Sequence, residues 1–185
     1  MTPVYRVRLK PWCWAVLFFI VICMSAVGCS PKIEPGTVLI VEGDAVEARM
    51  SFTLEELKAA EEGLVEADYF GINSYGSKGY SHFRGIWIGY LLRNLVDLQD
   101  DASLVSFIAE DGYQVEFSLE DVVKEDYIDE QNPSVKLKMI LAWEENGTES
   151  DPQTGYPLQL VVGQREPGDV NKPYWVRNVN TIRVD

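Results

Sequence analysis

Cysteine is missing from most of this 185-residue chain, because Cys13, Cys23 and Cys29 all lie within the first 29 residues. The part from Ser30 onward therefore has no disulfide, no cysteine-based zinc site and no thiol nucleophile. Histidine is almost as scarce, since His82 is the only one. A single imidazole does not support a serine catalytic triad or a zinc site with histidine ligands.

Basic residues are also in short supply. The chain has 16 Lys+Arg against 29 Asp+Glu, which gives a formal net charge of −13. Three of the basic residues and none of the acidic ones precede Ser30, so the remaining part carries 13 bases, 29 acids and a net charge of −16. Such an acidic surface argues against a nucleic-acid partner, which would need a basic face. It also repels anionic lipid headgroups.

The most apolar run of the chain is short. It covers residues 12–28 (WCWAVLFFIVICMSAVG) behind three basic residues, whereas crossing a membrane takes about 20 apolar residues. A short apolar run behind a basic start predicts a secretory signal. Its end, AVGC at residues 26–29, resembles a bacterial lipobox, and the resemblance implies lipidation of Cys29. The alternative is an uncleaved membrane anchor in which Cys29 is incidental.

Both interpretations predict an exported protein that is anchored to a cell membrane and faces away from the cytoplasm. The signal covers residues 1–29, and residues 30–36 (SPKIEPG) form a short tether with two prolines. Residues 37–185 are then expected to form one domain, which is long enough to bury a core without disulfides.

Short apolar segments between turn signals predict a fold with many strands. Strands are expected at residues 37–41, 45–52, 67–75, 104–109, 113–117, 135–143, 157–162 and 174–184. Capping boxes at residues 53–56 and 118–121 predict two short helices, and the apolar segment 86–95 predicts a third. Polar loops are expected at residues 73–84 and 144–155. Without a βαβ repeat, this order predicts an α+β fold with a mixed, mainly antiparallel sheet.

The glycine-rich stretch NSYGSKGYSHFR, residues 73–84, holds the candidate binding residues. They are Tyr75, Lys78, Tyr80, His82 and Arg84. The three potential cations among them could hold a phosphate or carboxylate, and the two tyrosines could stack on a flat heterocycle. The sequence therefore predicts a small anionic or heterocyclic ligand. The alternative is a surface loop whose basic groups pair with the surplus acidic residues.

The acidic residues form no pattern that predicts a metal site. Four of them crowd residues 144–151, but their spacing matches no calcium-binding loop. A solvated loop is the expected role of this segment, and no metal ligand is predicted.

Six segments, in order, resemble the molybdopterin-binding domain of the sulfite oxidase family. They are residues 38–57 (with SFTLEELK), 83–92 (FRGIWIGYLL), 105–122 (VSFIAEDGYQVEFSLEDV), 139–147 (MILAWEENG), 155–162 (GYPLQLVV) and 174–184 (YWVRNVNTIRV). The resemblance implies the fold of that domain, a molybdopterin cofactor and membership of a family of molybdenum oxidoreductases.

The resemblance also implies a cysteine ligand to molybdenum between the first helix and FRGIWIGYLL. The corresponding interval, residues 67–84, has no cysteine, and its serines are not equivalent to a soft thiolate ligand without strong activation. Gln159 and Gly163 stand where the family pattern has Arg and Pro. The sequence therefore predicts a degenerate or non-catalytic cofactor or anion binder, with molybdopterin as the implied cofactor. The alternative is a non-catalytic surface module that binds a protein partner through a sheet edge or the polar loops.

Overall fold

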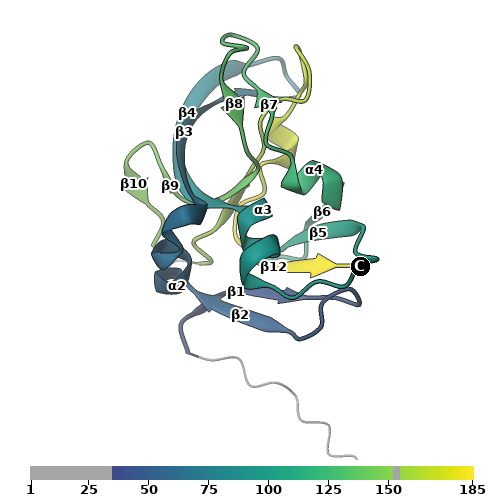
Figure 1. Ribbon diagram of the computed structural model, residues 1–185. Coiled ribbons are helices and arrows are strands. Elements are labelled where there is room, and N and C mark those ends of the chain that lie inside the picture. Colours follow the sequence, from purple (N-terminus) through teal and green to yellow (C-terminus); the bar gives the residue numbers. More distant parts are fainter. Residues whose placement is uncertain (1–34, 152–154) are drawn as a thin grey trace, which may run out of the picture. The chain divides into compact units, whose positions relative to one another are not determined.

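The computed structural model describes residues 35–151 and 155–185, which belong to the compact unit Ile33–Asp185 (Figure 1). The predicted signal, the predicted lipidation site Cys29 and residues 30–34 of the tether lie outside the described residues. Within the described ranges, no helix is long and apolar enough to cross a membrane.

The first sheet brings the two ends of the domain together. Its strands, in the order β2-β1-β12-β5-β6, are Met50–Thr53, Thr37–Glu42, Val179–Val184, Leu104–Ala109 and Gln114–Ser118. β1 runs parallel to β12, whereas the other neighbours are antiparallel. The inward-facing side chains of these strands, such as Leu39 and Ile182, are fully buried.

The second sheet is built around a long hairpin that curves through the upper part of Figure 1. Its strands, in the order β10-β9-β4-β3, are Thr148–Glu149, Ile140–Glu145, Lys78–Trp87 and Leu64–Ile72. β11 (Gln159–Val161) also pairs with β9, and β7 (Tyr127–Ile128) pairs with β8 (Lys136–Leu137) in a separate ribbon. Every pairing in these two sheets is antiparallel.

The described helices are all short. They are α2 (Leu54–Ala59), η1 (Glu61–Gly63), α3 (Ile88–Tyr90), the π turn η2 (Leu91–Leu95), α4 (Leu119–Val123) and η3 (Lys172–Tyr174). Among them, α2 and α4 begin at the capping residues that the sequence predicts. The Thr53 hydroxyl accepts from the Glu56 backbone N–H at 3.2 Å, and the Glu56 carboxylate accepts from the Thr53 N–H at 2.8 Å. Ser118 likewise accepts from the Asp121 N–H at 3.1 Å. The predicted α+β class with a mixed, mainly antiparallel sheet is confirmed.

The predicted strand at residues 45–52 is wrong in its first half, because β2 begins only at Met50. Gly43 has φ of +137°, and a Cβ atom on it would lie 2.0 Å from the Val184 carbonyl oxygen. Ala45 donates to that same carbonyl, and Glu47 donates to the Asp97 carbonyl. The backbone of this segment therefore bonds to distant parts of the chain instead of continuing the hairpin.

The loop predicted at residues 73–84 is also wrong, because most of it is strand β4. The turn itself covers residues 73–77, where the Asn73 side chain accepts from the N–H groups of Tyr75 and Ser77 and Gly76 adopts φ of +80°. Glycine and serine here mark a tight turn followed by a strand rather than an irregular loop.

Three further boundaries differ from the expectations. The predicted strand at residues 135–143 is divided into β8 and β9. The predicted loop at 144–155 is partly strand, because β9 continues to Glu145 and a tight turn at Asn146 and Gly147 leads into β10. The last strand starts at Val179, because residues 172–174 form a 3₁₀ turn.

Candidate functional site

Four of the five candidate residues lie on one face of β4. Lys78, Tyr80, His82 and Arg84 occupy alternate positions of the strand, so their side chains leave it on the same side. Their partners in register on β3 are Ile72, Phe70, Asp68 and Glu66, in that order. The fifth candidate, Tyr75, is 96% exposed in the β3–β4 turn. The hairpin therefore brings the predicted cations together with carboxylates of the neighbouring strand.

Lys78 is held by a carboxylate from another part of the fold. Its Nζ lies 2.9 Å from Glu130 Oε1, and Glu130 also accepts from the Gly168 N–H at 2.6 Å and from Gln164 Nε2 at 3.2 Å. The hydrogen bond from Lys78, followed by that from Gly168, lowers the pKa of Glu130 to about 2. The ammonium of Lys78 is consequently committed to an internal ion pair.

The lowered pKa of Glu130 predicts a specific loss of stability in acid. Its carboxylate stabilises the folded state above its ordinary pKa of 4.5, and this contribution is lost as the pH falls from about 4.5 towards 2. Glu130→Gln is therefore expected to reduce stability at pH 7 and to flatten the decline between pH 5 and pH 3. Urea unfolding at these pH values measures both effects. Glu110→Gln, at an exposed glutamate, is the control and should leave the wild-type pH profile unchanged.

Tyr80 binds Asp129, the residue that precedes the partner of Lys78 in the chain. Its hydroxyl donates to Asp129 Oδ2 at 2.8 Å, and its ring centroid lies 5.0 Å from that of Phe70. Desolvation and the bonded Asp129 carboxylate raise the pKa of Tyr80. Asp129 is only 4% exposed, so Tyr80 supplies a donor to a buried acid while half of its own surface faces solvent.

His82 bridges two acidic residues of β3. Its Nδ1 lies 2.8 Å from Asp68 Oδ1 and its Nε2 lies 3.3 Å from Glu66 Oε1. The hydrogen bonds to Asp68 and then Glu66 raise the pKa of His82, which favours the imidazolium. Arg84 is exposed and forms no ion pair with another described residue, although its register partners are Glu66 on β3 and Glu144 on β9. The positive charges of this face are therefore largely matched by negative ones.

Asn171 is a structurally central polar residue that the sequence did not single out. It is fully buried and occupies the outer edge of β3: Nδ2 donates to the Phe70 carbonyl at 3.1 Å, and Oδ1 accepts from the Ile72 N–H at 3.0 Å. Nδ2 also donates to the Val162 carbonyl at 2.9 Å. The carboxamide thus replaces a neighbouring strand at the end of β3. An isolated asparagine in a polar segment carries no sequence pattern that would have indicated this role.

The chain leaves no room for a larger side chain at Gly71 in β3. A Cβ atom there would lie 2.6 Å from Lys172 Cε and 2.9 Å from the Trp175 ring. Trp175 is itself fixed, because its Nε1 donates to the Val162 carbonyl at 2.9 Å. Side chains of η3 and of Trp175, which follows it, therefore pack directly against the end of β3.

A second polar feature lies at the opposite end of β4. Trp87 is 9% exposed, and its Nε1 has no hydrogen-bond partner among the described residues. Lys138 Nζ lies 3.9 Å from the centroid of the indole ring, and the Arg93 guanidinium lies 5.6 Å from it. Glu125 pairs with both cations, at 3.1 Å from Lys138 and 3.9 Å from Arg93. This cluster stabilises the junction of β4 and α3 by cation–π contacts.

The described residues contain no group of three or more His, Cys, Asp or Glu side chains that could hold a metal ion. Two of the acidic residues in the segment 144–151 form ion pairs: Glu145 binds Arg177 at 2.7 Å, and Glu149 binds Lys58.

The topology and the ordered segments together define an α+β domain with two mainly antiparallel sheets. The model of the oxidoreductase molybdopterin binding domain family matches residues 30–184, and the chain belongs to this family. The family binds a molybdopterin cofactor. The comparison with curated proteins found no match. The family resemblance deduced from the six segments is confirmed, whereas the binding roles of Tyr75, Lys78, Tyr80, His82 and Arg84 stay predictions.

Proposed function

We propose that this chain is a membrane-anchored, extracytoplasmic member of its family that binds no molybdenum and catalyses no oxygen transfer. The proposal rests on the side chains that are available as ligands to the metal. Residues 67–84, where the family ligand is expected, contain no cysteine, and the described part of the chain offers no alternative metal-binding group. The serine hydroxyls in this interval are neutral oxygen donors, and they are not equivalent to a charged, soft thiolate unless they are strongly activated. The residues present therefore do not fit the metal.

The charges on the β4 face support the same proposal. A molybdopterin carries an anionic phosphate, which needs cations that are free to bind it. Lys78 is paired with Glu130, and His82 lies between Asp68 and Glu66. Binding an anion through Lys78 or His82 would require these ion pairs to break, which leaves Arg84 as the one candidate cation of this face that has no ion pair with a described residue. The domain is accordingly a degenerate cofactor or anion binder at most, with the family fold retained.

A second candidate function is that of a non-catalytic protein-interaction module. Tyr75 favours it, because this aromatic side chain is almost fully exposed in the β3–β4 turn. The outer edge of β3 also favours this function, because no other described strand pairs with it. Asn171 covers only the last residues of this edge. An open strand edge can pair with an extended segment of another protein.

Metal and pterin analysis of the full chain tests the proposal. The chain is expressed in a host that makes the molybdenum cofactor, and molybdenum is measured by mass spectrometry. Released pterin is measured by fluorescence after denaturation. We expect no stoichiometric molybdenum, while a family member that has the cysteine loads fully in the same host. Stoichiometric molybdenum in this chain would contradict the proposal. Pterin without metal would favour the degenerate binder, and the absence of both would favour the interaction module.

The anchoring part of the proposal rests on the first 29 residues, in which a basic start precedes a short apolar run and Cys29. Mass spectrometry of the membrane-extracted protein identifies its N-terminal residue and any lipid attached to it. A lipid-modified Cys29 start supports lipidation, whereas an unmodified Met1 start indicates an uncleaved anchor. Recovery of the protein from the soluble cytoplasmic fraction would contradict both.

A further inference from the structure

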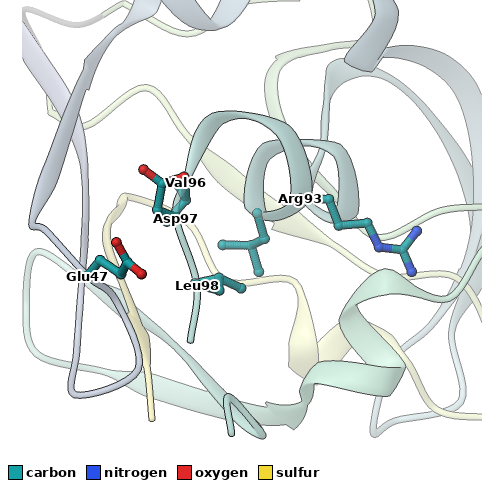
Figure 2. Close-up of a pocket in the computed structure, with 6 residues that line it drawn as sticks. Glu47, Arg93, Val96, Asp97 and Leu98 are labelled. Atoms are coloured by element: carbon teal, nitrogen blue, oxygen red, sulfur yellow. The ribbon is translucent and has the colours of Figure 1, made fainter. Parts of the chain in front are cut away.

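A surface hollow of about 360 Å³ lies beside the π turn η2 (Figure 2). Its lining residues are Glu47, Leu92, Arg93, Val96, Asp97 and Leu98. Leu92 and Val96 are 1% and 6% exposed, and together with the half-buried Leu98 they form the apolar part of a lining that also includes Glu47, Arg93 and Asp97. A volume of this size lies at the lower end of the range of about 300–1,000 Å³ that is typical of small-molecule sites.

Two carboxylates lie at the rim of the hollow without a matching cation. The side chains of Glu47 and Asp97 are exposed, and neither makes an ion pair or hydrogen bond with another described residue. The backbone fixes them as neighbours, because the Glu47 N–H donates to the Asp97 carbonyl at 3.0 Å and Val46 forms a β-bridge with Leu98. Both carboxylates lie on the same side of the hollow in Figure 2.

Arg93 does not neutralise these carboxylates, although it also lines the hollow. Its guanidinium extends towards the opposite side in Figure 2. There it lies 5.6 Å from the centre of the Trp87 ring and 3.9 Å from Glu125. Asp100 and Asp101 follow a few residues after the rim and are both exposed. The potential at the rim is therefore negative, beside the apolar side chains of Leu92, Val96 and Leu98.

We propose that this hollow binds an alkylammonium group. The alkyl stem would pack on Leu92, Val96 and Leu98, and the ammonium would lie beside Glu47 and Asp97. An anion would be repelled by the rim, and a neutral apolar molecule would leave both carboxylates uncompensated. The group could belong to a free aliphatic amine or to a lysine side chain of another protein. The proposal is independent of the cofactor question, because none of these residues lies on β3 or β4.

Titration of the detergent-solubilised full chain with n-butylammonium, corrected for empty micelles, tests the proposal. Amide NMR shifts of residues 92–98 report binding at the hollow. We expect butylammonium to bind at least about tenfold more tightly than butyrate, which has the same stem length and the opposite charge. The Glu47→Gln/Asp97→Asn variant is expected to weaken butylammonium binding about tenfold, because two exposed charge contacts are removed.

The matched control removes the same number of charges elsewhere, as Glu110→Gln/Glu116→Gln, and should leave the affinity within about twofold of wild type. Equal binding of butyrate, an unchanged affinity in the Glu47→Gln/Asp97→Asn variant, or an equal loss in the control would overturn the proposal. Nα-acetyl-lysine N-methylamide distinguishes the two sources: tighter binding than butylammonium indicates a lysine of a partner protein, and weaker binding indicates a free amine. Failure of both amines to bind would also overturn it.

Discussion

Replacing Gly85 with alanine is expected to lower the free energy of unfolding by about 3 kcal/mol, among the larger effects of any single methyl group in this domain. Gly85 lies in β4 opposite Ala142 of β9, at a break in the register of the two strands. A Cβ atom there would lie 2.2 Å from the Leu141 carbonyl oxygen and 2.6 Å from the Ala142 Cα. Both atoms belong to the backbone, so no side-chain rotation relieves the contact.

The cost at Gly85 arises because β4 and β9 are the two inner strands of the second sheet. Moving them apart would weaken their hydrogen bonds and disturb Ile86 and Leu141, which are fully buried. Urea unfolding of the full chain, with the slope of the transition compared between variants, measures the loss.

Gly79→Ala is the matched control, since Gly79 lies on the same strand with no atom within 4 Å of the added Cβ. Its backbone φ is not in the left-handed region, so alanine should be neutral or stabilise the domain by up to about 1 kcal/mol. Equal losses at the two glycines would show that β4 tolerates no change of any kind, and would contradict the specific contact with β9.

The elements that could be predicted from the sequence depend on residues close together in the chain. The helix caps at Thr53 and Ser118 each join residues three apart, and the Asp111-Gly112 turn joins two strands that adjoin it. In these places the local sequence contains nearly all the atoms that determine the conformation. The family resemblance added the order of the segments, which local patterns do not supply.

The elements that were missed depend on distant contacts. β1 and β12 pair in parallel although they lie at opposite ends of the domain, and Gly43 turns the chain against Val184 instead of closing a short hairpin. The candidate site shows the same division. The alternation of residues 78, 80, 82 and 84 is a strand pattern that the glycine content obscured, and it could have been recognised. Glu130, which pairs with Lys78, and Asp129, which accepts from Tyr80, lie about 50 residues away, and no spacing rule connects them to β4.

Asn171→Asp is expected to lower the free energy of unfolding at pH 7 by about 3–5 kcal/mol. The Asn171 Nδ2 donates to two carbonyl oxygens, those of Phe70 and Val162, in a fully buried position. Aspartate would present a carboxylate oxygen to the same carbonyls, which replaces two hydrogen bonds with repulsion. Only the bond from the Ile72 N–H to Oδ1 would be kept.

The pH dependence of this variant separates the buried charge from a simple loss of packing. Burial and the two carbonyls would raise the pKa of the introduced carboxyl above its unfolded value of about 3.9. A raised carboxyl pKa means that the folded variant binds a proton more readily than the unfolded one, so the penalty is largest near pH 7 and shrinks as the pH falls towards 4. Asn171→Ala, which introduces no charge, should show a smaller loss without this additional pH dependence.

Asn132→Asp provides the control for the change of side chain itself. Asn132 is exposed, and its Oδ1 accepts from the Ser134 hydroxyl at 2.7 Å, a role that aspartate retains. Its effect is expected to stay within about 0.5 kcal/mol. If Asn171→Asp were equally mild, or if its penalty grew in acid, the carboxamide would not be the group that closes the end of β3, and the fixed position of Trp175 beside Gly71 would need another cause.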